Sequence, residues 1–62
     1  MADKLAYSTA ETAEVLGVSR PVVYRLMQRA DFPAFKLGNR TLISVEGLRA
    51  WVQAQVERGE SA

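Results

Sequence analysis

The stretch Gly17–Arg29, GVSRPVVYRLMQR, decides the fold of this chain. It predicts a tight turn and then a short helix, whose residues at about 100° per step fall on two unlike faces. One face is apolar and suits a core: Val22, Val23, Leu26, Met27 and Ala30. The other face has no acid and carries cations, an aromatic ring and an amide: Arg20, Pro21, Tyr24, Arg25, Gln28 and Arg29. Such a face is typical of contact with a polyanion and with base edges.

A second helix is expected just before this stretch. Ser8 followed by Glu11 is a capping box, which predicts a helix that runs to about Leu16. Gly17 suits the position after a helix, where a left-handed backbone carries no steric penalty. Because only Gly17 and Val18 stand before the N-cap of the next helix at Ser19, the two helices must cross steeply. This pattern predicts a helix-turn-helix.

The residues after the second helix predict a β-hairpin. Pro33 cannot continue a helix, so the second helix ends before it. Residues 34–37 and 40–43 read as short strands around the two-residue loop Gly38-Asn39. In that register Phe35 pairs with Leu42, and we expect this pair to pack on the helices. The tip of the hairpin would display three polar side chains: Lys36, Asn39 and Arg40.

Ser44 predicts the start of a third helix, with Glu46 favourably placed in its first turn. Its apolar stripe consists of Val45, Leu48, Trp51, Val52 and Val56. Trp51 could stack on a base, but its place in this stripe favours packing in the core. The predicted fold is therefore mostly α with a small β-hairpin, a winged helix-turn-helix. We assign residues 7–57 to this domain, residues 1–6 to a flexible N-terminal arm and residues 58–62 to a frayed tail.

Composition excludes several classes of function. The 62 residues include no cysteine and no histidine, so a disulfide framework, a thiolate or imidazole metal site and catalysis by these groups are excluded. We expect no enzyme activity, no cofactor and no metal. No apolar run is long enough to cross a membrane and no signal-peptide pattern appears. We therefore expect a cytoplasmic, nucleoid-associated protein from a bacterial, phage or mobile-element context.

The distribution of charge is more informative than the net charge of +1. Residues 15–45 carry five cations against one acid, whereas the flanking segments are acidic overall. This polarity suits one face that docks on nucleic acid. Chance clustering of cations in a small protein is the competing interpretation.

At the level of whole motifs, the chain resembles the excisionase-type DNA-binding domain, which is related to the N-terminal domain of MerR-type regulators. The resemblance rests on STAETAEVLGVSRPVVYRL at residues 8–26, FKLGNR at residues 35–40 and SVEGLRAWV at residues 44–52. It implies sequence-specific binding of double-stranded DNA, with the second helix in the major groove and the wing on the backbone or in a minor groove. It also implies cooperative self-association on DNA and a tyrosine- or serine-type integrase as partner, with excision as the outcome.

The resemblance can be carried onto individual residues. Arg20 is the best candidate for bidentate contact with guanine, and Gln28 could read adenine. Ser19 and the helix N-terminus suit a phosphate, while Pro21 and Tyr24 lie where the helix meets the groove. The remaining cations and the amide of the wing are expected to hold the backbone: Arg25, Arg29, Lys36, Asn39 and Arg40. Of the wing residues, Arg40 is the best candidate to reach a minor groove.

Several alternatives remain open at this stage. A small phage- or plasmid-type transcriptional regulator would have the same fold, and a protein-interaction module could have lost DNA binding. Tyr24 could instead cover the edge of the core. Lys36 and Arg40 could serve solubility and protection of a strand edge.

Overall fold

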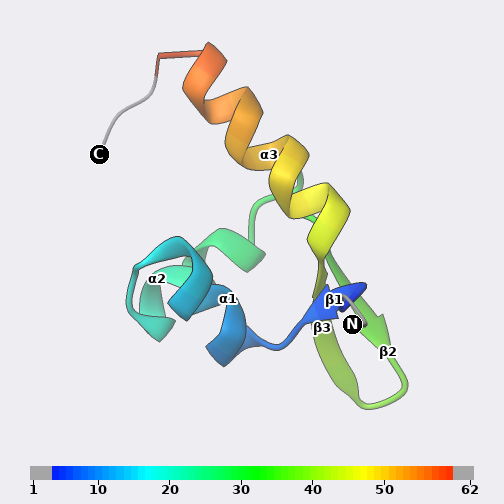
Figure 1. Cartoon of the computed structure of the whole chain (residues 1–62). Helices are drawn as coiled ribbons and strands as arrows, with labels where there is room; N and C mark the ends of the chain where they lie inside the picture. Colours follow the sequence, from blue (N-terminus) through cyan, green and yellow to red (C-terminus); the bar gives the residue numbers. More distant parts are fainter. Residues whose placement is uncertain (1–3, 60–62) are drawn as a thin grey trace.

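A computed structural model describes residues 4–59. Residues 1–3 of the expected arm and residues 60–62 of the expected tail lie outside the described residues. The elements are β1 (Ala6–Tyr7), α1 (Thr9–Leu16), α2 (Arg20–Met27), β2 (Ala34–Leu37), β3 (Arg40–Ser44) and α3 (Val45–Glu57). Figure 1 shows α1 packed against α2 on one side of the sheet, with α3 rising from the end of β3. This order confirms the predicted fold class.

Local hydrogen bonds form the helix-turn-helix as the sequence predicts. The Glu11 amide donates to Ser8 Oγ at 3.1 Å, and the Ser8 amide donates to Glu11 Oε1 at 2.9 Å, which completes the capping box. Gly17 ends α1 with φ of 74°, the left-handed conformation that glycine adopts without strain. The amides of Gly17 and Val18 both donate to the Ala13 carbonyl, at 2.9 and 3.0 Å. These bonds satisfy the end of α1 and direct the chain into α2.

The hairpin has the predicted register but presents the opposite face to the helices. Phe35 pairs with Leu42, as expected, and Ala34 pairs with Ile43. The prediction that Phe35 and Leu42 face the helices is wrong, because Ile43 is fully buried whereas Phe35 is 41% exposed. Since strand side chains alternate, the core contact of Ile43 turns the Phe35–Leu42 pair outward.

A third strand, β1, joins the sheet and was not predicted. The strand order is β1-β3-β2, and Tyr7 pairs with Ile43 across β1 and β3. The Val45 amide also donates to the Leu5 carbonyl at 3.0 Å, which extends this contact to the start of α3. Ala6, which the sequence analysis assigned to the N-terminal arm, is therefore paired with Ser44 in the sheet.

The core lies where α1, β3 and α3 meet. Phe32, Ile43 and Leu48 are its buried centre, and Trp51 packs against them with its ring 5.0 Å from that of Phe32 in an edge-to-face geometry. The predicted core role of Trp51 is confirmed. Along α3 the apolar stripe continues beyond the core, where Val56 is 65% exposed.

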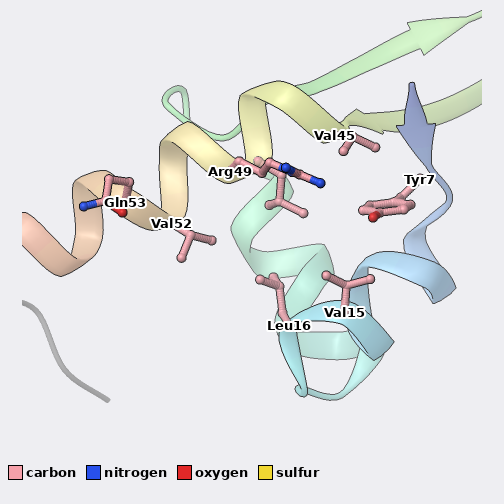
Figure 2. Close-up of a pocket in the computed structure, with 8 residues that line it drawn as sticks. Tyr7, Val15, Leu16, Val45, Arg49, Val52 and Gln53 are labelled. Atoms are coloured by element: carbon pink, nitrogen blue, oxygen red, sulfur yellow. The ribbon is translucent and has the colours of Figure 1, made fainter. Parts of the chain in front are cut away.

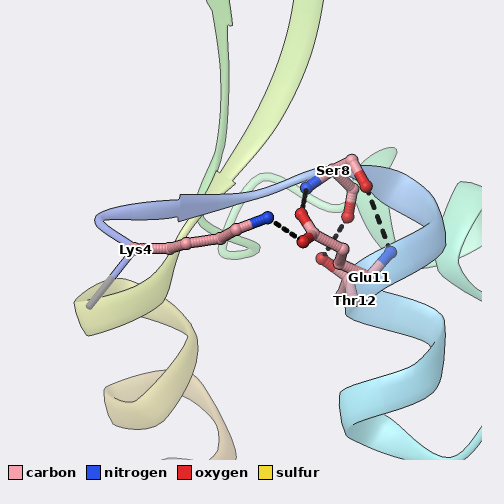
Figure 3. A network of polar contacts seen from close by, with 4 residues as sticks. All are labelled: Lys4, Ser8, Glu11 and Thr12. Carbon is pink, nitrogen blue, oxygen red and sulfur yellow. Dashed lines mark hydrogen bonds and ion pairs between the residues drawn. The ribbon is translucent and has the colours of Figure 1, made fainter. Parts of the chain in front are cut away.

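Stability is expected to fall when the pH is lowered through the carboxylate range. Hydrogen bonds from Lys4 and from the Ser8 amide lower the pKa of Glu11 from its ordinary value of 4.5 (Figure 3). Arg29 likewise lowers the pKa of Asp31. A depressed folded-state pKa gives stability that is complete above the ordinary pKa and is lost as the pH falls through the folded value. The free energy of unfolding in urea, followed by circular dichroism from pH 7 downward, should therefore decline below about pH 4.5.

Glu11→Gln removes the negative charge of this side chain, while the glutamine oxygen can still accept the hydrogen bond from the Ser8 amide. The variant therefore tests how much the charge contributes to the acid dependence of stability. This variant should show a shallower loss of stability in acid than the parent chain. Glu14→Gln, a matched change on the exposed side of α1, serves as the control. An unchanged acid dependence in Glu11→Gln would show that the Lys4–Glu11 pair contributes nothing.

Candidate nucleic-acid interface

The two faces of α2 separate as the sequence predicts. Val23 is fully buried, and Val22, Leu26 and Met27 are half-buried, so this side holds α2 in place. The opposite side is exposed and carries most of the predicted contact residues: Ser19, Arg20, Pro21, Tyr24 and Arg25. Tyr24 is 55% exposed, which leaves its ring and hydroxyl available to a ligand.

The N-terminus of α2 is open to solvent at Ser19 and Arg20, beside a hollow that Glu11 and Glu14 of α1 also line. Ser19 occupies the N-cap position with an extended backbone, and Pro21 lies in the first turn. The Ser19 hydroxyl, however, forms no cap hydrogen bond among the described residues. The first turn contains no acid that could neutralise the helix dipole. The Ser19 hydroxyl and the backbone amides at the start of α2 can therefore both donate hydrogen bonds to an anion.

Two of the predicted contact residues lie beyond the end of α2. The helix ends at Met27, and the amides of Gln28 and Arg29 donate three residues back, to Arg25 and Leu26. The prediction that one regular helix includes Gln28 and Arg29 is therefore wrong. The buried position of Phe32 in the core explains this early turn, because the chain must leave the α2 axis to place that ring.

Arg29 has partners within the chain. Its Nε and Nη2 donate to the Asp31 carboxylate at 3.0 and 3.2 Å, and its guanidinium lies 6.0 Å from the centre of the Trp51 ring. Planar guanidinium groups favour both contacts. The neighbouring acid offsets the charge that Arg29 could offer to a phosphate.

The wing presents its polar groups on two faces. Lys36, Asn39 and Arg40 are all exposed, and Gly38 takes φ of 64° in the two-residue turn. Lys36 pairs with Thr41, whereas Arg40 pairs with Leu37. Because neighbouring pairs alternate between faces, the two cations project from opposite sides of the ribbon.

Sequence reasoning missed a residue at this tip. Leu37 is 65% exposed and pairs with Arg40 across the hairpin. Its place directly before a two-residue turn is visible in the sequence and could have indicated an exposed leucine at the tip.

α1 connects the helical part of this interface to the wing. It packs against α2 on one side and against β3 on the other. α1 therefore helps to position the exposed face of α2 relative to the hairpin, together with Leu26 and Met27, which pack α2 directly on the core (Figure 1).

One hollow outside this interface lies between α1 and α3. It encloses about 370 Å³ and is lined by side chains that approach from the two helices and from β1: Tyr7, Val15, Leu16, Val45, Leu48, Arg49, Val52 and Gln53. Figure 2 shows Val15 and Leu16 on one wall and Val52 on the other. Its lining is largely apolar and holds no carboxylate pair for acid–base chemistry.

Metal-site and membrane features can be assessed for residues 4–59. They contain no cluster of three or more histidine, cysteine, aspartate or glutamate side chains placed to hold a metal ion. Within the same range, none of the helices has the length and apolar character needed to cross a bilayer.

Two helices joined by a glycine turn, followed by a β-hairpin and a third helix, define a winged helix-turn-helix protein. Comparison with known families agrees: residues 6–56 match the family described as helix-turn-helix domain, and the chain belongs to that family. This is a DNA-binding domain family.

The curated relatives share the domain but come without a described function. An uncharacterized protein of Mycobacterium bovis, Mb2337, and one of Mycobacterium tuberculosis, Rv2310, are each 33% identical over 54 residues. The match covers 87% of this chain and 47% of each relative, so the chain spans about half the length of these proteins. No solved structure matches the chain.

Proposed function

We propose that this chain binds double-stranded DNA in a sequence-specific way, with α2 in the major groove and the wing on the adjacent backbone or minor groove. The observation that carries the proposal is the exposed, acid-free face of α2, with Arg20, Tyr24 and Arg25 above a fully buried Val23. A buried opposite face fixes the direction in which these side chains project. Binding of a duplex selected from a random library by the purified chain tests the proposal.

Within this proposal the residues divide into base readers and backbone holders. Arg20, at the N-terminal end of α2, reads guanine, and Gln28, at its C-cap, reads adenine. Ser19 donates its uncommitted hydroxyl to a phosphate, while Pro21 and Tyr24 pack on sugar or a thymine methyl. The backbone is held mainly by the exposed groups of α2 and the wing: Arg25, Lys36, Asn39 and Arg40. Of these, Arg40 also extends from the wing into a minor groove. Arg29 contributes least, because Asp31 already occupies it.

These contacts predict a marked salt dependence. Roughly four to six phosphate contacts should give a slope of about −4 to −5 in a plot of log affinity against log salt, through release of counterions. Arg40→Ala is expected to weaken binding to every sequence alike and to make the slope shallower by about 1. Fluorescence anisotropy at several salt concentrations measures both quantities.

Arg58→Ala is the matched control, since Arg58 is an exposed cation at the C-terminal end of α3 and does not belong to the wing. It should leave the slope unchanged. An equal effect of the two substitutions would place the wing away from DNA.

We infer further that the chain acts as an excisionase-like architectural factor, which directs a tyrosine- or serine-type integrase toward excision. The motif resemblance over residues 8–52 supports this role. A single module buries only about 600–1,000 Å², which favours several copies on one site. Sequencing of genomic DNA captured by the chain would show repeated neighbouring sites at a recombination junction. A single operator over a promoter would instead identify a transcriptional regulator.

Cooperative binding needs a contact between copies, and α3 offers one. Val52 and Val56 are 36% and 65% exposed along one stripe, flanked by Arg49 and Glu57. When two copies of α3 pack antiparallel, the valines meet and Arg49 of each copy lies near Glu57 of the other. This arrangement joins apolar burial with charge complementarity.

Val56→Asp should therefore reduce cooperativity on a duplex with two adjacent sites by about 5-fold or more, the range of typical coupling energies. Affinity for a single site should not change, because Val56 lies on α3 outside the α2–wing surface. Ala54→Asp adds the same charge on the opposite side of α3 and is the control. Cooperativity that survives in Val56→Asp would exclude this contact.

A further inference from the structure

The outer face of the wing is apolar toward its tip. Leu37 is 65% exposed and Phe35, behind it on the same strand face, is 41% exposed. Neither side chain belongs to the core, whose members lie on the other face of the sheet with Ile43. Leu37 and Phe35 lie together on this face, and exposed apolar side chains that adjoin one another beside polar groups mark an interaction site.

The register ties this leucine to Arg40. Leu37 and Arg40 are directly opposite each other across β2 and β3, and such pairs have their Cβ atoms about 4.5–5.5 Å apart on one face of the ribbon. Lys36 and Thr41 occupy the other face. A DNA groove that receives the Arg40 guanidinium therefore receives Leu37 as well.

We propose that Leu37 is an apolar wedge, which enters the minor groove next to Arg40, inserts between two base pairs and kinks the duplex. The proposal rests on the DNA binding proposed above. Arg40 supplies the charge that holds the groove, and Leu37 supplies apolar surface that replaces part of the lost stacking. Phe35 and Leu42 back the wedge from the same face of the wing. The preferred substrate is a duplex with a flexible pyrimidine–purine step at this point, because such steps unstack most easily.

The turn geometry suits insertion. Gly38 and Asn39 form a two-residue loop with Gly38 at φ of 64°, so no longer loop surrounds Leu37 at the tip. A narrow tip with one branched side chain beside a cation can approach the floor of a groove, whereas the broader body of the sheet cannot. The wing would then bend DNA as well as anchor it.

The test uses the full chain and a duplex selected from a random library by that chain. Dyes at the two ends report the bend by energy transfer, and 2-aminopurine at each pyrimidine–purine step reports unstacking. With the parent chain we expect a bent duplex and a rise in 2-aminopurine fluorescence at one step. Leu37→Ala should abolish both signals and lower affinity by about tenfold, whereas Leu37→Met should retain them.

Leu5→Ala is the matched control, since Leu5 is 88% exposed and lies outside the wing. Circular dichroism verifies that the variants fold. An unbent duplex with the parent chain, or equal signals from Leu37→Ala, overturns the wedge while sequence-specific binding stands. Failure of the parent chain to bind any selected duplex overturns the proposed function, and the wedge with it.

Discussion

Arg20→Ala is expected to reduce affinity for the selected duplex by about 1–3 kcal/mol while reducing affinity for a scrambled duplex much less. Arg20 is the first residue of α2, and its side chain is exposed beside the open N-cap at Ser19. A guanidinium there can donate two hydrogen bonds to a guanine edge, which the scrambled duplex does not offer in register. The ratio of the two dissociation constants, measured by anisotropy at one salt concentration, is the readout.

Arg25→Ala provides the comparison within the same helix. Arg25 lies one turn later and is assigned to phosphate, so its loss should weaken both duplexes to a similar extent. If Arg20→Ala also lowered both affinities equally, the assignment of Arg20 as a residue that reads bases would be wrong.

Ile43→Ala is expected to unfold most of the chain. Ile43 is fully buried and joins β1, β2 and the core through its pairings with Tyr7 and Ala34. Truncation of such a side chain costs about 2–5 kcal/mol. A domain of this size has a free energy of unfolding of roughly 3–5 kcal/mol, so the loss caused by Ile43→Ala is comparable to the whole of it. Urea titration followed by circular dichroism measures the loss.

Leu5→Ala removes the same kind of apolar surface from an exposed position and should change stability by no more than about 0.5 kcal/mol. Should Ile43→Ala unfold at the same urea concentration as the parent chain, the core described above would be incorrect.

The parts of the fold that could be predicted are those determined by neighbouring residues. The start of α1 depends on Ser8 and Glu11, three residues apart, and its end depends on the backbone freedom of Gly17. The hairpin register likewise follows from the short Gly38-Asn39 turn. In each case the hydrogen-bonding partners lie within a few residues.

The parts that could not be predicted depend on contacts between distant segments. The pairing of Ala6 and Tyr7 with β3 joins residues more than thirty apart, and it helps decide that Ile43 faces inward. Thr12 is a polar residue that is fully buried, with its hydroxyl donating to the Ser8 carbonyl at 2.9 Å.

In the candidate site, too, features that depend on neighbouring residues could be predicted, and features that depend on distant contacts could not. The exposed face of α2 follows from helical periodicity, which is a local property. The ion pair of Arg29 with Asp31 depends on where α2 ends, and that end is determined by the burial of Phe32 in the core. The outward position of Phe35 and Leu37 on the wing depends on which face of the hairpin packs on the core, and that face is the one with Ile43.

The most direct test of the account is a titration of the intact chain with two duplexes of identical composition, one selected by the chain and one scrambled. Sequence-specific reading by α2 predicts that the selected duplex binds at least about tenfold more tightly and that this preference persists as salt is raised, because base contacts do not depend on counterions as phosphate contacts do. Equal affinity for the two duplexes, or no binding to either at low salt, would contradict the account.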